Sequence, residues 1–138
     1  MTTTVEVAEA WMPRHPKSSS AARGLLREFL GSVVDGNLFA EVGGLVLTEL
    51  VNNAVQHART PRDRLIFLRF EMEPGLLRIE VHDACGELPA VRWAGADDES
   101  GRGLRLVEHL SQAWGLSPRA GVGKAVWALI APLDGGTT

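Results

Sequence analysis

Apolar residues recur at helical spacing in three segments of the chain. The first begins at Ser18–Ser20, whose hydroxyls predict an N-terminal cap, and runs to Val33, before a Gly-Asn pair breaks the pattern. The second extends from about Phe39 to Ala58, and the third opens at Gly101–Gly103. Because apolar positions three and four residues apart share one side of a helix, all three segments are predicted to be amphipathic helices.

Alternating apolar and polar residues predict strands in most of the remaining chain. The predicted strands are 3–11, 64–72, 76–83, 113–116 and 124–131. A Glu-Pro-Gly turn joins the second strand to the third, and a Gly-Val-Gly turn precedes the last strand. The resulting order, β-α-α-β-β-loop-α-β-β, predicts an α+β layered sandwich rather than a doubly wound parallel sheet.

Residues 84–100 follow neither pattern and are rich in Gly, Ala, Pro and acidic residues. A connection of this length without secondary structure is uncommon in a compact domain and is usually functional or mobile. The segment is therefore expected to have a functional role or to be mobile.

Composition narrows the class of protein. The 138 residues suffice for one domain, 1–138, with one sizeable core, and 45% of them are hydrophobic. A net charge of -3 disfavours a non-specific nucleic-acid binder, because such proteins carry an excess of Lys and Arg. One basic group (Arg59, Arg62, Arg64 and Arg69) is better explained as a solvated rim or as a docking site for an acidic partner.

Two further features concern the cellular compartment. The single Cys85 cannot form an internal disulfide, and the N-terminus lacks the basic and apolar regions of a secretory signal. No apolar run approaches the roughly 18 residues that a membrane helix needs. A cytoplasmic location without membrane contact is expected.

The second predicted helix contains a polar half. Thr48, Glu49, Asn52, Asn53, Gln56 and His57 fall within about half of its helical wheel. A solvated face explains this pattern, although Asn and Thr form exposed helix less well than Glu, Lys or Arg. Alternatively, Glu49 and Asn53, one turn apart, would present a carboxylate and an amide oxygen to a magnesium ion. For His57 a structural hydrogen bond is the preferred interpretation, since the four histidines show no metal-ligand spacing.

Two other segments carry candidate chemistry. Asp83 ends a predicted strand and would either start a turn or present its carboxylate to an amino-bearing ligand at the sheet edge. Gly101 and Gly103 stand where a long loop becomes a helix, so their main-chain N–H groups would either cap that helix or approach an anionic ligand.

Together the three motifs resemble the Bergerat ATP-binding fold of gyrase, histidine kinases and the anti-sigma-factor serine kinases. Glu49–Ala54 resembles the E-x-x-x-N-A motif of the N box, and Asp83 resembles the Asp of the D-x-G-x-G box. Gly101–Leu104 is similar to the G-x-G-L box. The match covers about residues 15–131 and is most similar to the anti-sigma regulatory, serine-kinase-like branch. It implies a mixed, mostly antiparallel sheet covered on one face by helices.

The resemblance also implies ligands and residue roles. ATP and Mg²⁺ would be bound, with Asn53 coordinating the metal that bridges the phosphates. Glu49 would act as the catalytic base or polarise the attacking hydroxyl. Asp83 would accept a hydrogen bond from the adenine amino group. The remaining nucleotide contacts would come from Gly86, Gly101, Arg102, Gly103 and Leu104, and residues 84–100 would form a lid.

The implied function is a serine/threonine protein kinase acting on an anti-anti-sigma partner, in a regulator that also contacts a sigma factor and forms a homodimer. Three positions depart from the family pattern. Cys85 and Glu87 replace glycines of the second box, and Ala125 replaces a Thr. These departures keep a second hypothesis open, a non-catalytic nucleotide-sensing or protein-binding module with an altered ATP site.

Overall fold

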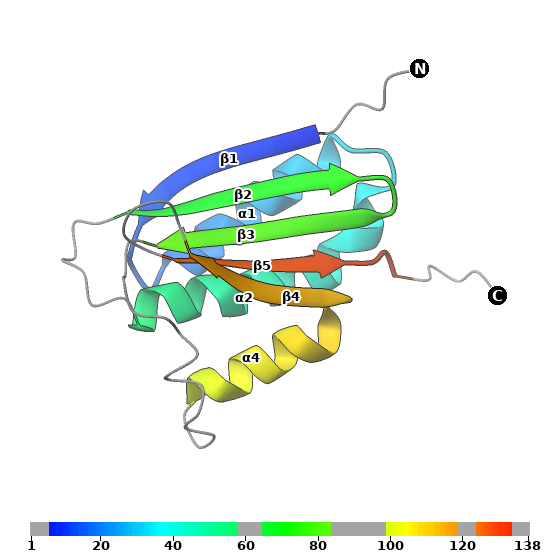
Figure 1. The fold of residues 1–138 in the computed structure, drawn as a ribbon. Helices are drawn as coiled ribbons and strands as arrows, with labels where there is room; N and C mark the ends of the chain where they lie inside the picture. Colours follow the sequence, from blue (N-terminus) through cyan, green and yellow to red (C-terminus); the bar gives the residue numbers. More distant parts are fainter. Residues whose placement is uncertain (1–5, 58–64, 84–98, 119–123, 134–138) are drawn as a thin grey trace.

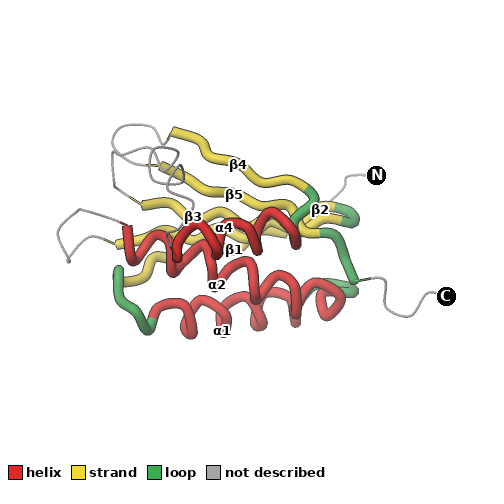
Figure 2. Tube along the Cα trace, turned by 90° about the horizontal axis from the view of Figure 1, so that it is seen from below, coloured by secondary structure: helices red, strands yellow, loops and turns green. Residues whose placement is uncertain are grey.

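One antiparallel sheet forms one layer of the structure, and the helices form the other (Figure 1). The structure is a computed structural model that describes residues 6–57, 65–83, 99–118 and 124–133. The sheet has five strands in the order β1-β2-β3-β5-β4, and every pairing between these strands is antiparallel. Seen at right angles, the helices lie on one face of the sheet only (Figure 2). The predicted α+β sandwich is confirmed.

The strands follow the predicted positions closely. They are β1 (Glu6–Pro13), β2 (Leu65–Glu73), β3 (Leu76–Asp83), β4 (Ala113–Pro118) and β5 (Lys124–Ile130). The turn between β2 and β3 places Gly75 at φ 78°, a left-handed conformation that glycine adopts without strain. The predicted Gly-Val-Gly turn at 121–123 lies outside the described residues.

The helices are α1 (Ser18–Gly31), the 3-10 helix η1 (Gly36–Phe39), α2 (Ala40–His57) and α4 (Glu99–Leu110). One local prediction was wrong. Ser18–Ser20 do not cap α1, whose N-cap is Lys17 and has no side-chain cap bond. The Ser18 hydroxyl instead donates to the carbonyl of Pro13 and is buried, because the loop folds back on the end of β1.

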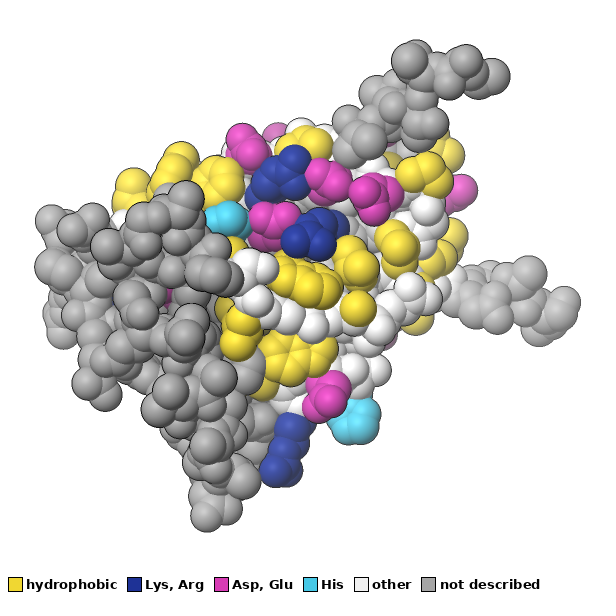
Figure 3. Space-filling model, viewed as in Figure 1, with side chains coloured by type: hydrophobic (Ala, Val, Ile, Leu, Met, Phe, Trp, Pro, Cys, Tyr) yellow, Lys and Arg dark blue, Asp and Glu magenta, His cyan; other side chains and the backbone are white. Residues whose placement is uncertain are grey.

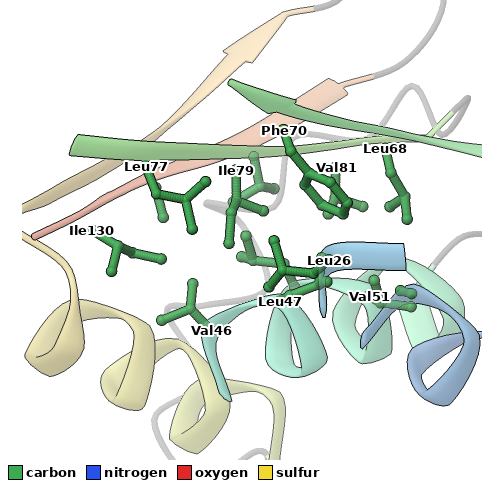
Figure 4. Packing of buried hydrophobic residues seen from close by; sticks show 14 of the residues in the cluster. Leu26, Val46, Leu47, Val51, Leu68, Phe70, Leu77, Ile79, Val81 and Ile130 are labelled. Atoms are coloured by element: carbon green, nitrogen blue, oxygen red, sulfur yellow. The ribbon is translucent and has the colours of Figure 1, made fainter. Parts of the chain in front are cut away.

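The core fills the space between the two layers (Figure 4). Alternate residues of β2 and β3 are buried, as a sheet covered on one face requires. Helix α2 is central: it packs against α1, α4, β3 and β5. The residues that meet there include Leu26, Val46, Leu47, Val51, Leu68, Phe70, Leu77, Ile79, Val81 and Ile130.

Among the described residues one segment, Gly36–Val55, has the length and hydropathy of a possible membrane span. Its mean hydropathy is 1.3, and 44% of it is buried inside the structure. This composition matches the central position of α2, which must present apolar side chains to the sheet and to neighbouring helices.

The sheet face that carries no helices bears a network of charged residues at its centre, with hydrophobic side chains around it (Figure 3). Arg69 lies 2.7 Å from Glu71, 3.3 Å from Glu9 and 3.7 Å from Glu80. Glu80 also accepts hydrogen bonds from Arg78 and His82, at 2.6 and 2.8 Å. The interpretation of Arg69 as part of a basic rim was therefore wrong, because acidic neighbours on three strands surround it.

Candidate functional site

Helix α2 holds two of the predicted site residues one turn apart. Asn53 is buried, with 6% of its surface exposed, whereas Glu49 is only half-buried. An amide side chain loses hydration when buried and needs hydrogen-bonding partners or a ligand in return. The solvated-face interpretation therefore fails for Asn53.

Asp83 is the last residue of β3 and is 3% exposed. Its side chain faces the helix layer, since it follows the buried Leu77, Ile79 and Val81 at alternate positions. The described residues include three buried polar side chains, namely Ser18, Asn53 and Asp83. Ser18 donates its hydroxyl hydrogen bond to the carbonyl of Pro13, away from this site. The remaining two residues, Asn53 and Asp83, are those that the sequence motifs had already singled out.

The third motif lies at the same end of the molecule. The carboxyl end of β3, the carboxyl end of α2 and the amino end of α4 all point to one side (Figure 1). Helix α4 packs against α2 and begins at Glu99, so Gly101 lies in its first turn and Gly103 at the start of its second. The first four N–H groups of a helix have no acceptor within it, and they favour an anion there. Leu104 is 5% exposed, which makes it a packing residue at the helix start.

Several predicted features cannot be placed. Gly86, Cys85 and Glu87, together with most of the proposed lid, lie outside the described residues. The side chains of Arg102 and His57 are also outside that part, although both residues belong to described helices. Their proposed roles stay predictions.

The polar half of α2 also contains a second row of side chains, which begins at Thr48 and includes Asn52. This row faces a different direction from the row of Glu49 and Asn53. Arg23 of α1 donates from Nη1 to the Thr48 hydroxyl at 3.0 Å, and Thr48 donates to the carbonyl of Gly44 at 2.8 Å. This contact ties α1 to α2 one residue before Glu49. Sequence reasoning missed Arg23, since no local pattern links residues 25 positions apart.

The strand register shows which face of the sheet carries Ala125, the residue that replaces a Thr of the family pattern. Ala125 is opposite His82, whereas Lys124 is opposite Asp83. Successive residues of a strand point to opposite faces, so Ala125 faces the side of the sheet away from Asp83. Replacement of Thr by Ala therefore alters the helix-free face rather than the side that Asp83 occupies.

The described residues contain no group of three His, Cys, Asp or Glu side chains that would hold a metal. Helix α2 offers two oxygen donors at this end, the Asn53 amide and the Glu49 carboxylate one turn away, while the Asp83 carboxylate ends β3. Magnesium is commonly bound by one or two protein ligands together with substrate phosphates and water. The residues present fit such a shared site.

Comparison with known proteins identifies the fold. A family model described as histidine kinase-like ATPase domain matches residues 12–129. No curated protein sequence matches the chain.

Two solved structures are similar to it. The RsbU and RsbW domains of Rv1364c from Mycobacterium tuberculosis superpose with a TM-score of 0.69 at 16% identity, over 92% of this chain and 32% of that one. The histidine kinase domain of the blue-light activated histidine kinase EL346 from Erythrobacter litoralis gives 0.56 at 23% identity, over 88% of this chain and 62% of that one. At these identities the likeness concerns the fold alone, and the chain spans only part of each protein.

Proposed function

The chain belongs to the histidine kinase-like ATPase domain family, and from this premise we propose that it binds Mg-ATP and transfers the γ-phosphoryl group to a partner protein. One observation carries the proposal. Asn53 and Asp83 are buried polar side chains at the end of the molecule where α4 begins. Polar side chains and an anion-attracting helix end that meet at one end of the fold are the groups that an adenine nucleotide with its phosphates needs, so this grouping favours a ligand-binding role.

Each residue has a proposed task. The Asp83 carboxylate accepts a hydrogen bond from the adenine amino group, which selects adenine over guanine. The main chain at Gly101 and Gly103 approaches the phosphates, and Arg102, Leu104 and Gly86 complete the nucleotide contacts. Asn53 supplies an amide oxygen to Mg²⁺, and this ion neutralises phosphate charge when bound.

Glu49 is the proposed catalytic base. A Ser or Thr hydroxyl oxygen of the partner bonds to the γ-phosphorus, the bond to the bridging oxygen breaks, and ADP leaves with that electron pair. Glu49 accepts the hydroxyl proton. Its half-buried position one turn from Asn53 suits a group that must reach both the nucleotide and an incoming protein.

The proposed substrate is an anti-anti-sigma protein, and the regulator also contacts a sigma factor. These partners rest on the motif resemblance to the anti-sigma serine kinases. The RsbW domain in one similar structure agrees with that resemblance at the level of the fold.

A homodimer is proposed through the helix-free sheet face. Trp11 is 56% exposed there, and its ring lies 4.8 Å from that of Phe67. Val7 and Leu65 are also exposed, at 43% and 47%. Exposed apolar groups of this size commonly mark a protein interface.

The test combines binding and phosphotransfer. The protein is incubated with labelled ATP, Mg²⁺ and an anti-anti-sigma protein encoded by the same organism, and the acceptor is examined for label. Glu49→Gln is expected to lower transfer by about 10²-fold or more while leaving ATP affinity nearly unchanged. Glu41→Gln, an exposed acid on the same helix, is the matched control and is expected to keep full activity.

The outcomes separate the two functional hypotheses. ATP binding without transfer to any partner would favour the non-catalytic nucleotide-sensing module that Cys85 and Glu87 suggest. Absence of ATP binding would leave a protein-binding module only. GTP binding as tight as that of ATP would contradict the role of Asp83.

A further inference from the structure

Lys and Arg residues gather in one part of a chain that is acidic overall. The net charge is -3, yet residues 14–27 contain four basic residues, Arg14, Lys17, Arg23 and Arg27, and neither Asp nor Glu. The last two stand four residues apart in α1, so their side chains lie on one face of this helix. Protein surfaces usually intersperse both signs of charge, so this separation marks a candidate interaction surface.

Arg23 and Arg27 also lack the acidic neighbours that other arginines have. On the helix-free face of the sheet, Arg69 lies within 3.7 Å of three glutamates. Within the part of the chain that the structure describes, neither Arg23 nor Arg27 forms an ion pair. Arg23 donates to a neutral hydroxyl, and Arg27 is exposed. Both positive charges can therefore attract carboxylates of another molecule.

Arg23 lies beside the proposed catalytic base. Its Nη1 donates to the Thr48 hydroxyl at 3.0 Å, which holds the guanidinium against α2. Glu49 is the next residue of that helix. A protein bound to Arg23 would therefore lie close to the carboxylate that is proposed to accept its hydroxyl proton.

An apolar side chain lies close to Arg27. Helices α1 and α2 lie side by side (Figure 2) and run antiparallel, because Leu26 approaches Gly43, later in α1 but earlier in α2 than the hydrogen bond just described. Arg27 is therefore level with Gly44, where an added Cβ would meet nothing within 4 Å. Leu45 follows and is 48% exposed. The surface next to Arg27 is thus uncovered and partly apolar.

We propose that Arg23, Arg27 and Leu45, which we call the docking strip, bind an acidic face of the phosphoacceptor protein. The inference rests on the proposed kinase function, since it states where the protein substrate is held. Carboxylates of the acceptor pair with the two guanidinium groups, and an apolar side chain packs on Leu45. This contact holds the acceptor on the outer side of the helix layer, next to Glu49.

Two other occupants are less well supported. Nucleic acid is usually bound by proteins with an excess of Lys and Arg, whereas this chain has a net charge of -3. An exposed leucine also suits a protein surface better than a phosphate backbone. A second copy of the chain is proposed to bind to the helix-free sheet face, in the opposite layer from the docking strip.

The test measures phosphorylation at varied concentrations of the same anti-anti-sigma protein that is used to test the kinase function. Arg27→Glu is expected to raise the KM for this acceptor about tenfold or more, because it replaces attraction by repulsion. The kcat at saturating acceptor and the KM for ATP are expected to change less than about twofold, since binding alone is lost. Leu45→Glu is expected to raise the acceptor KM in the same way.

A matched variant controls for the change in net charge. Arg105→Glu reverses the charge of an exposed arginine on α4, outside the docking strip. It is expected to change the acceptor KM less than about twofold. Isothermal titration calorimetry of each variant with the acceptor, in the absence of nucleotide, measures docking independently of phosphotransfer.

Three results would overturn the proposal. The first is an unchanged acceptor KM in Arg27→Glu, and the second is an equal rise in Arg105→Glu, which would show only general attraction between the proteins. The third is binding of a 20-base-pair DNA duplex that Arg27→Glu abolishes without an effect on the acceptor.

Failure of docking and failure of the kinase function give different results. Normal phosphotransfer by Arg27→Glu, with an unchanged acceptor KM, would remove the docking strip and leave the kinase function in place. Acceptor binding that only Arg27→Glu and Leu45→Glu weaken, without phosphotransfer by the wild-type chain, would support docking and contradict the kinase function. Absence of acceptor binding to the folded wild-type chain would contradict docking.

Discussion

Asn52 and Asn53 are neighbours in the chain, but α2 places them in different surroundings. Asn53 is buried, whereas Asn52 is half-buried on the row that begins at Thr48. Residue type alone cannot separate them. The motif resemblance proposes Asn53 as the magnesium ligand, and the burial of Asn53 but not of Asn52 supports this choice.

This difference leads to a paired prediction. Asn53→Ala is expected to weaken Mg-ATP binding about tenfold or more, because it removes the proposed metal ligand. Asn52→Ala is expected to change affinity less than about threefold. Isothermal titration calorimetry with and without Mg²⁺ measures both, and circular dichroism checks that each variant is folded. Equal losses in the two variants would remove the assigned role of Asn53.

Glu80 provides a prediction about pH. Burial raises the pKa of its carboxyl, but hydrogen bonds from Arg78 and His82 and the charges of both outweigh burial and leave the pKa below its ordinary value. The folded state therefore binds this proton less readily than the unfolded chain. The stabilisation is present above the unfolded pKa, near 4.5, and is lost as the pH falls through the lower folded pKa.

Urea unfolding measured between about pH 6 and pH 3 tests this. The midpoint is expected to fall less steeply with acid in Glu80→Gln than in the wild-type chain. Glu73→Gln, at the exposed end of the same hairpin, serves as the control and is expected to follow the wild type. Parallel curves for all three proteins would mean that the Glu80 network does not govern acid stability.

At the scale of elements, α2 contains two adjacent glycines with different neighbours. A Cβ at Gly43 would lie 3.1 Å from Leu77 and 3.4 Å from Leu26, whereas a Cβ at Gly44 would meet nothing within 4 Å. Gly43 therefore allows α2 to approach both α1 and β3 closely. Gly44 contributes no such packing.

Gly44→Ala is expected to stabilise the protein by about 0.5–1 kcal/mol, because alanine costs less backbone entropy in a helix. Gly43→Ala should lose most or all of this gain, since Leu77 and Leu26 are fully buried and have little room to move. The free energy of unfolding in urea measures both. A gain at position 43 as large as that at 44 would show that the two layers adjust freely.

For the whole molecule, the helix-free sheet face raises the question of assembly. If two chains pair through the patch around Trp11, Trp11→Glu should abolish the dimer, because it places two charges in an apolar interface. Leu45→Glu is the control: Leu45 is 48% exposed on α2, in the opposite layer. Sedimentation velocity is expected to give the mass of one chain for the first variant and of two for the second. A wild-type protein that sediments as a monomer at all concentrations would contradict the proposed dimer.

Local patterns in the sequence determined the elements and pointed to the site. Helical spacing, strand alternation and turn residues act over a few positions, so they predicted the three helices, the five strands and the α+β class. The spacing of Glu49 and Asn53 on one helix is likewise local. The resemblance of the three motifs then indicated the family, which the family match confirms.

Tertiary structure decided what depends on contacts between distant segments. Burial of Asn53 and Asp83 arises from packing α2 against the sheet, and the Arg23–Thr48 bond joins two helices. Ser18 leaves its predicted cap because the chain folds back on Pro13. The edge position of β1 follows from the strand order, and the hollow between β1 and α1 follows from how these two elements pack. None of these has a short-range signal, because each is set by which surfaces meet when the core is buried.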